Sequence, residues 1–133
     1  MAHILIVEDD PNITKLLSVR LEHSGYTVTV APDGVQALAN VHTYAPDLIL
    51  LDIMLPGLSG FEVAKRLKLD ITTSHIPIIM LTARSDGQSA MTGVARGADA
   101  YLTKPIDFSD LIRHIETCLR HSTLPALRSP DDE

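Results

Sequence analysis

Residues 48–57 read LILLDIMLPG. Four apolar residues in a row, Leu48 to Leu51, are followed directly by one acidic residue, Asp52. An uninterrupted apolar run of this length is typical of a strand that is covered on both faces, and such strands belong to parallel sheets. The stretch therefore predicts a buried parallel strand that ends in a single carboxylate.

Short apolar runs of this kind recur along the chain. Those at residues 4–7 and 78–81 are also continuously apolar rather than alternating, which again favours strands with both faces covered. The five predicted strands are His3–Val7, Thr27–Ala31, Leu48–Asp52, Ile76–Thr82 and Ala100–Thr103.

The segments between these runs have helical spacing and recognisable start signals. Asp10 is placed to cap a first helix, with Pro11 in its first turn, where the missing N–H costs nothing. Further start signals are Asp33 with Gln36, Ser59 with Glu62, Ser85 with Gln88, and Asp107. The first helix has the apolar stripe Ile13, Leu16, Leu17 and Leu21 and ends near Gly25, and the last has the stripe Phe108, Leu111, Ile112, Ile115, Cys118 and Leu119.

Strand and helix thus alternate five times. This repeat predicts the α/β class, with an open, doubly wound, parallel sheet and helices on both of its faces. Residues 1–121 are expected to form one domain. Residues 122–133, which contain Pro125 and the acidic end Asp131–Glu133, are expected to be a flexible tail or the stub of a linker.

Composition and charge exclude several classes of protein. The chain has 133 residues, which suits one domain, and a formal net charge of -6, which disfavours direct binding to nucleic acid. The single cysteine cannot form an internal disulfide, as fits a reducing cytoplasm. No apolar run approaches the roughly 20 residues that span a bilayer, and Met1 leads directly into a predicted strand, so neither a membrane segment nor a signal peptide is expected.

Chemistry-bearing residues follow four of the five predicted strands. Ligands of open α/β sheets bind outside the carboxyl ends of the strands, and these ends carry Glu8 and Asp9, then Asp52, Thr82 and Lys104. Carboxylates that lie within a few ångströms of one another favour a hard cation, and oxygen ligands with room for water favour Mg²⁺. A carboxylate kept ionised beside such a cation could attack phosphorus, with the lysine and the hydroxyl around the phosphoryl oxygens.

Four sequence blocks strengthen this prediction because they occur together and in order. Residues Val7–Asp10, Leu51–Gly57, Leu81–Ala83 and Tyr101–Pro105 resemble the signature blocks of the receiver domains of response regulators in two-component signalling. The resemblance runs from about residue 3 to residue 120. It implies a flavodoxin-like (βα)5 fold with the strand order 2-1-3-4-5.

The resemblance also implies roles for particular residues of the acidic blocks. Asp52 matches the aspartate that accepts the phosphoryl group. Glu8 and Asp9 match the acidic pair that holds Mg²⁺, and the backbone carbonyl of Met54 matches a further metal ligand. Gly57 and Gly60, by contrast, are expected to serve the geometry of the loop.

The remaining blocks match residues that respond to the phosphoryl group. Thr82 and Tyr101 match a switch pair in which the hydroxyl turns toward the phosphoryl group and the ring turns inward. Lys104 matches the lysine that pairs with the phosphorylated aspartate. The peptide bond between Lys104 and Pro105 matches one that is usually cis in the family, which would help to aim the lysine.

The function implied is that of a phosphorylation-driven signalling module in the cytoplasm rather than a metabolic enzyme. Its partners would be a histidine kinase or phosphotransfer protein and an effector protein or fused effector domain.

A phosphatase of the haloacid-dehalogenase type is an alternative, but it needs a second aspartate where this chain has Met54. A receiver that only binds partners would be expected to lack Asp52, Thr82 or Lys104. A flavin-binding fold would need a Ser/Thr-rich phosphate loop after the first strand.

Two regions carry further expectations. Gly87 and Gly93 lie within the predicted helix at residues 85–96, and each glycine costs about 1 kcal/mol in a helix interior, so this helix should be the least stable.

Receivers of winged-helix transcription factors typically have two aspartates before the switch tyrosine and an arginine midway along the last helix. This chain has Ala100 and His114 there, so we expect its output not to be a dimeric DNA binder of that kind.

Overall fold

The computed structural model describes residues 2–83 and 98–127. Within these residues, five parallel strands form one sheet with the order β2-β1-β3-β4-β5, as predicted. The strands are β1 His3–Val7, β2 Thr27–Ala31, β3 Leu48–Asp52, β4 Ile78–Thr82 and β5 Ala100–Thr103; the helices are α1 Pro11–His23, α2 Gly34–Tyr44, α3 Gly60–Leu69 and α5 Phe108–Leu127. The helix predicted at residues 85–96 lies outside the described residues.

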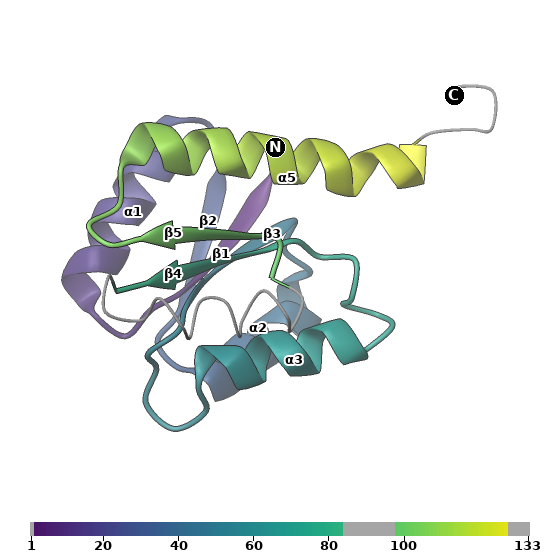
Figure 1. The fold of residues 1–133 in the computed structure, drawn as a ribbon, viewed down its shortest axis with the longest axis horizontal. Helices are drawn as coiled ribbons and strands as arrows, with labels where there is room; N and C mark the ends of the chain where they lie inside the picture. The colour runs from purple at the N-terminus through teal and green to yellow at the C-terminus, as the bar shows by residue number, and fades with distance from the viewer. Residues whose placement is uncertain (1, 84–97, 128–133) are drawn as a thin grey trace.

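Helices cover both faces of the sheet, as Figure 1 shows: α1 and α5 lie on one face and α2 and α3 on the other. Alternate residues of the same strand enter different cores. In β1, Ile4 and Ile6 pack toward α1 and α5, whereas Leu5 and Val7 pack toward α2 and α3. This arrangement explains why the central strands are continuously apolar, since a polar side chain on either face would be buried without a partner.

The strand register brings the carboxyl ends of the strands to one edge. Val7 pairs with Leu51, Asp52 pairs with Leu81, and Thr82 pairs with Thr103. The residues that follow β1, β3, β4 and β5 therefore emerge side by side. The fold positions the predicted site at this edge.

The predicted capping residues begin their helices. Asp10 accepts a hydrogen bond from the backbone N–H of Asn12 at 2.9 Å, and Asp33 accepts one from Gln36 at 2.8 Å. Ser59 and Asp107 cap α3 and α5 in the same way. Each cap satisfies an N–H group that the helix cannot pair internally.

Three details differ from the sequence-based expectations. Strand β4 begins at Ile78 instead of Ile76, because Pro77 has no N–H to donate and the N–H of Ile76 is used in a turn to Thr73. Helix α5 continues to Leu127, into the segment expected to be a tail, and the domain boundary at residue 121 stays a prediction. Leu16 belongs to the apolar stripe of α1 but is exposed.

No helix within the described residues has the length and apolar character needed to cross a bilayer.

Candidate functional site

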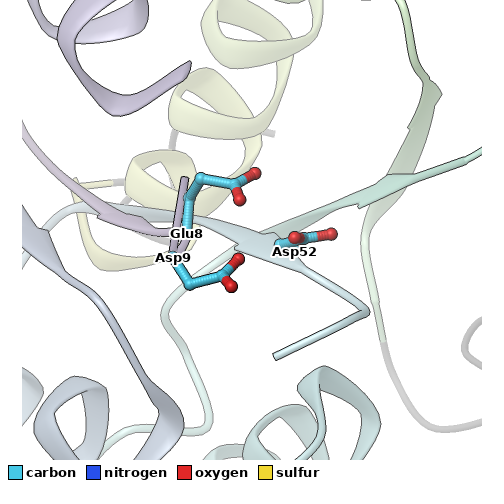
Figure 2. A group of neighbouring side chains, drawn as sticks. All are labelled: Glu8, Asp9 and Asp52. Atoms are coloured by element: carbon cyan, nitrogen blue, oxygen red, sulfur yellow. The ribbon is translucent and has the colours of Figure 1, made fainter. Parts of the chain in front are cut away.

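Three carboxylates gather at the carboxyl edge of the sheet. Glu8 and Asp9 follow β1, and Asp52 is the last residue of β3. One ligand oxygen from each of the three lies within 4.8 Å of the others, and Figure 2 shows the side chains projecting from the two neighbouring strand ends toward the same side. Glu8 and Asp52 are buried, whereas Asp9 is exposed. Asp9 thus lies at the solvent side of the group and the other two at its floor.

Among the residues that the structure describes, Lys104 is the one that brings a positive charge to this cluster, from the loop after β5. Its Nζ lies 3.0 Å from Oε1 of Glu8 and 3.4 Å from Oδ2 of Asp52. The backbone N–H of Lys104 donates to the carbonyl of Thr82 at 2.7 Å, which holds the loop against the end of β4. The Lys104-Pro105 peptide bond is cis, as the resemblance implied.

Burial and charge act in opposite directions on the two residues of the ion pair. Burial raises the pKa of Glu8 above its usual value, and the hydrogen bonds from Lys104 and Asp10 only partly offset it. Burial lowers the pKa of Lys104, but the hydrogen bond to Glu8 and the charge of Asp52 outweigh that effect, so its pKa is raised. The buried carboxylate is therefore short of positive charge, while the ammonium group stays protonated.

The donor set fits a divalent cation. Within residues 2–83 and 98–127, three carboxylates face a single ammonium group. Excess negative charge at such a site is unfavourable unless a cation balances it. All the side-chain donors are oxygens, which hard cations such as Mg²⁺ prefer. Glu8, Asp9 and Asp52 are therefore suited to hold such an ion.

Met54 lies beside the acidic cluster, and the role of its carbonyl as a metal ligand stays a prediction. Its backbone N–H is 3.3 Å from Oδ1 of Asp52, so the chain turns back over the aspartate immediately after β3. The Met54 side chain is 67% exposed, which leaves it over the surface beside the site.

Thr82 and Tyr101 lie on neighbouring strands next to the site. Thr82 ends β4, is buried, and donates its hydroxyl hydrogen bond to the carbonyl of Ala83 at 3.0 Å. Tyr101 on β5 is partly buried and packs against the core on the side of α2 and α3. Its hydroxyl is buried and has no hydrogen-bond partner among the described residues, and burial raises its pKa.

Gly60 has a steric role that the sequence did not reveal. It is the first residue of α3, and a Cβ atom there would collide with the backbone carbonyl of Asp52 and lie 2.8 Å from Cα of Ile53. Glycine thus lets α3 begin against the end of β3. Only Gly57, with φ of 73°, serves the loop geometry that was expected of both. Any residue can adopt the helical φ at the position directly after the cap Ser59. A glycine at this position was therefore the signal that α3 begins close to another backbone segment.

A family model described as the response regulator receiver domain matches residues 4–116. The chain is 44% identical over 122 residues to the DNA-binding dual master transcriptional regulator RpaA of Synechocystis sp., covering 92% of this chain and 51% of that protein. It is 45% identical over 119 residues to the phosphate regulon transcriptional regulatory protein PhoB of Pseudomonas aeruginosa, covering 90% and 52%. The chain therefore spans about half the length of these curated relatives.

Solved structures agree with the sequence relatives. The receiver domain of the Francisella response regulator 1452 superposes with a TM-score of 0.83 at 30% identity, covering 92% of this chain and 99% of that one. A response regulator receiver domain protein from Clostridium thermocellum superposes with a TM-score of 0.87 at 28% identity, covering 93% and 98%.

Proposed function

Because this chain belongs to the response-regulator receiver family of two-component signalling, we propose that Asp52 is the residue that accepts the phosphoryl group. The observation that carries the proposal is the position of Lys104, whose Nζ contacts both Glu8 and Asp52. A cation so placed can pair with Asp52 before transfer and with phosphoryl oxygens after it.

The transfer itself requires little of the protein beyond positioning. An oxygen of the Asp52 carboxylate forms a bond to phosphorus, while the bond from phosphorus to the donor's histidine nitrogen breaks and its electron pair stays on that nitrogen. Lys104 and the hydroxyl of Thr82 neutralise and hydrogen-bond the phosphoryl oxygens. By the same contacts the domain promotes its own phosphorylation and the later hydrolysis of the acyl phosphate.

The metal ion of the proposal is Mg²⁺. Glu8, Asp9, Asp52 and the carbonyl of Met54 would hold it, and when bound it neutralises charge on the phosphoryl group. The excess of carboxylates over ammonium groups at the site supports this assignment.

The switch is assigned to Thr82 and Tyr101. The Thr82 hydroxyl has a neighbouring backbone carbonyl as its acceptor, an interaction that it can exchange for a phosphoryl oxygen. Movement of Thr82 would change the surroundings of Tyr101, which lies on the adjacent strand with its hydroxyl already buried.

The two alternative functions gain no support. Met54 stands where a phosphatase needs its second aspartate, and Lys104 contacts Asp52, unlike in a receiver that only binds partners.

The partners of the proposal are a histidine kinase or phosphotransfer protein and an effector protein or fused effector domain, all in the cytoplasm, with no direct contact between this chain and nucleic acid. Relatives such as RpaA are named as DNA-binding regulators, and the chain spans about half of their length. These names do not favour our expectation that the output differs from a dimeric DNA binder. The expectation stays a prediction that rests on Ala100 and His114.

Acetyl phosphate with Mg²⁺ tests the assignment of Asp52. Intact-mass analysis should show the wild-type protein gaining one labile phosphoryl group, and Asp52→Asn should gain none. Asp110→Asn, which changes a partly exposed aspartate on α5 that pairs with Arg113, is the matched control and should react at the wild-type rate. Modification of Asp52→Asn at the wild-type rate would show that another residue is the acceptor.

A further inference from the structure

A largely apolar cavity of about 320 Å³ lies between α1 and the segment that leads from β5 into α5. Leu16 and Arg20 line it from α1, and Lys104, Ile106 and Phe108 line it from the opposite side. The lysine of the acidic site is thus also part of a wall of this cavity. Any contact that fixes this wall acts on the segment that carries Lys104.

A cation–aromatic contact joins the two walls of the cavity. The guanidinium carbon of Arg20 lies 4.3 Å from the centre of the Phe108 ring, within the range at which a cation is attracted to an aromatic face. Phe108 is the first residue of α5 and packs against the core between the sheet and the two helices α1 and α5. The contact therefore ties α1 to the beginning of α5.

This contact holds one end of a very short loop. Lys104 follows β5 directly, and Phe108 lies four positions further along the chain. The upstream end is fixed by the hydrogen bond from the N–H of Lys104 to the carbonyl of Thr82, 2.7 Å long. The downstream end is held by the packing of Phe108 against the core and by Arg20 over its ring. Because so few residues join Phe108 to Lys104, a displacement of Phe108 is expected to shift Lys104.

We infer that Arg20 is a positioning residue for Lys104: by holding Phe108, it keeps the Lys104 ammonium group within reach of Asp52. The inference rests on the proposed function, since it assigns Arg20 an effect on phosphorylation of Asp52. Arg20 itself is not part of the acidic cluster. Because a 1 Å displacement of a catalytic group can change a rate strongly, a surface contact in α1 can affect chemistry at the edge of the sheet.

The experiment measures the rate constant for phosphorylation of Asp52 by acetyl phosphate with Mg²⁺. A small donor is used because it needs no docking surface, so any loss arises within the receiver itself. Arg20→Gln should lower the rate constant about two- to fivefold, the factor that corresponds to an exposed cation–aromatic contact. Arg20→Lys keeps a cation over the ring and should recover most of the loss. Phe108→Leu should match Arg20→Gln.

The matched control is Arg66→Gln, which removes an exposed arginine from α3 and should leave the rate constant unchanged. The decisive comparison repeats Arg20→Gln in a Lys104→Ala background, with donor concentration raised to keep the slower reaction measurable. If Arg20 acts through Lys104, the second substitution has no further effect there.

Two results would overturn the inference: a wild-type rate constant for Arg20→Gln, or the same factor of loss in both backgrounds, which would indicate general loosening of the fold. Failure of the proposed function is distinguishable, because then the wild-type protein would gain no phosphoryl group on Asp52 in the first place.

Discussion

Two lysines bind carboxylates at opposite edges of the same sheet, and their surroundings differ. At the amino-terminal edge, Nζ of Lys68 lies 3.3 Å from Oδ2 of Asp99 and also donates to the carbonyls of Ser74 and Ile76. Asp99 accepts a second hydrogen bond from the N–H of Ile78. One ammonium group meets one carboxylate there, and hydrogen bonds to the backbone support both groups. At the carboxyl edge, Lys104 faces more carboxylates than it can neutralise.

The difference distinguishes a structural ion pair from a reactive one. The pair of Lys68 and Asp99 is balanced in charge, and it holds the end of α3 against the beginnings of β4 and β5. The cluster at Lys104 has excess negative charge, and burial disfavours the charged form of Glu8. Such a cluster favours the binding of a cation. The first should matter for stability and the second for chemistry.

Lys104→Ala tests the reactive side of this comparison and should have the largest effect. We expect the rate constant for phosphorylation by acetyl phosphate with Mg²⁺ to fall roughly 100-fold, as when a donor that stabilises developing charge is removed. Lys68→Met serves as the control and should react at the wild-type rate. A wild-type rate for Lys104→Ala would mean that the ion pair with Asp52 has no part in the transfer.

Lys68→Met tests the structural side. The substitution removes a charged donor from two carbonyls and one carboxylate, which should lower the free energy of unfolding by about 1–2 kcal/mol. Urea unfolding followed by circular dichroism measures it. Lys65→Met, an exposed lysine on the same helix, should change it by less than about 0.5 kcal/mol. Equal stability of the two variants would refute the structural role of Lys68.

Asp70→Asn should have a smaller effect, on the pH dependence of stability. Asp70 lies in the turn between α3 and β4, which Lys68 also contacts. The hydroxyl and the N–H of Thr72 donate to Asp70 at 2.7 and 2.9 Å, and these hydrogen bonds hold the pKa of Asp70 below its usual range. A lowered pKa stabilises the fold above the unfolded-state pKa of about 4, and this contribution is lost as the pH falls through the folded-state pKa.

Thermal unfolding between neutral pH and strongly acidic pH measures this contribution. Asp70→Asn should lose less stability than the wild-type protein as the pH falls below about 4, with no change in phosphorylation at neutral pH. Parallel acid curves for the two proteins would contradict the prediction.

The comparison also shows what could be predicted from the sequence. The strands, the caps Asp10 and Asp107, and the convergence of Asp52 with Lys104 follow from local patterns and from the rule that parallel strands end at one edge. The pair of Lys68 with Asp99 could not be predicted, because no motif marks either residue and Lys68 lies on a helix rather than at a strand end. The steric role of Gly60 depends on how closely α3 approaches β3, and the position of the glycine directly after the cap Ser59 was its one signal in the sequence.

The identity of the phosphorylated residue tests the central claim most directly. The protein is treated with acetyl phosphate and Mg²⁺, reduced with borohydride, which converts an aspartyl phosphate into homoserine, and then digested and sequenced by mass spectrometry. We predict homoserine at position 52, and none when Mg²⁺ is removed by a chelator before the donor is added. Homoserine at Asp9 or at any other aspartate, with Asp52 intact, would contradict the assignment of this site.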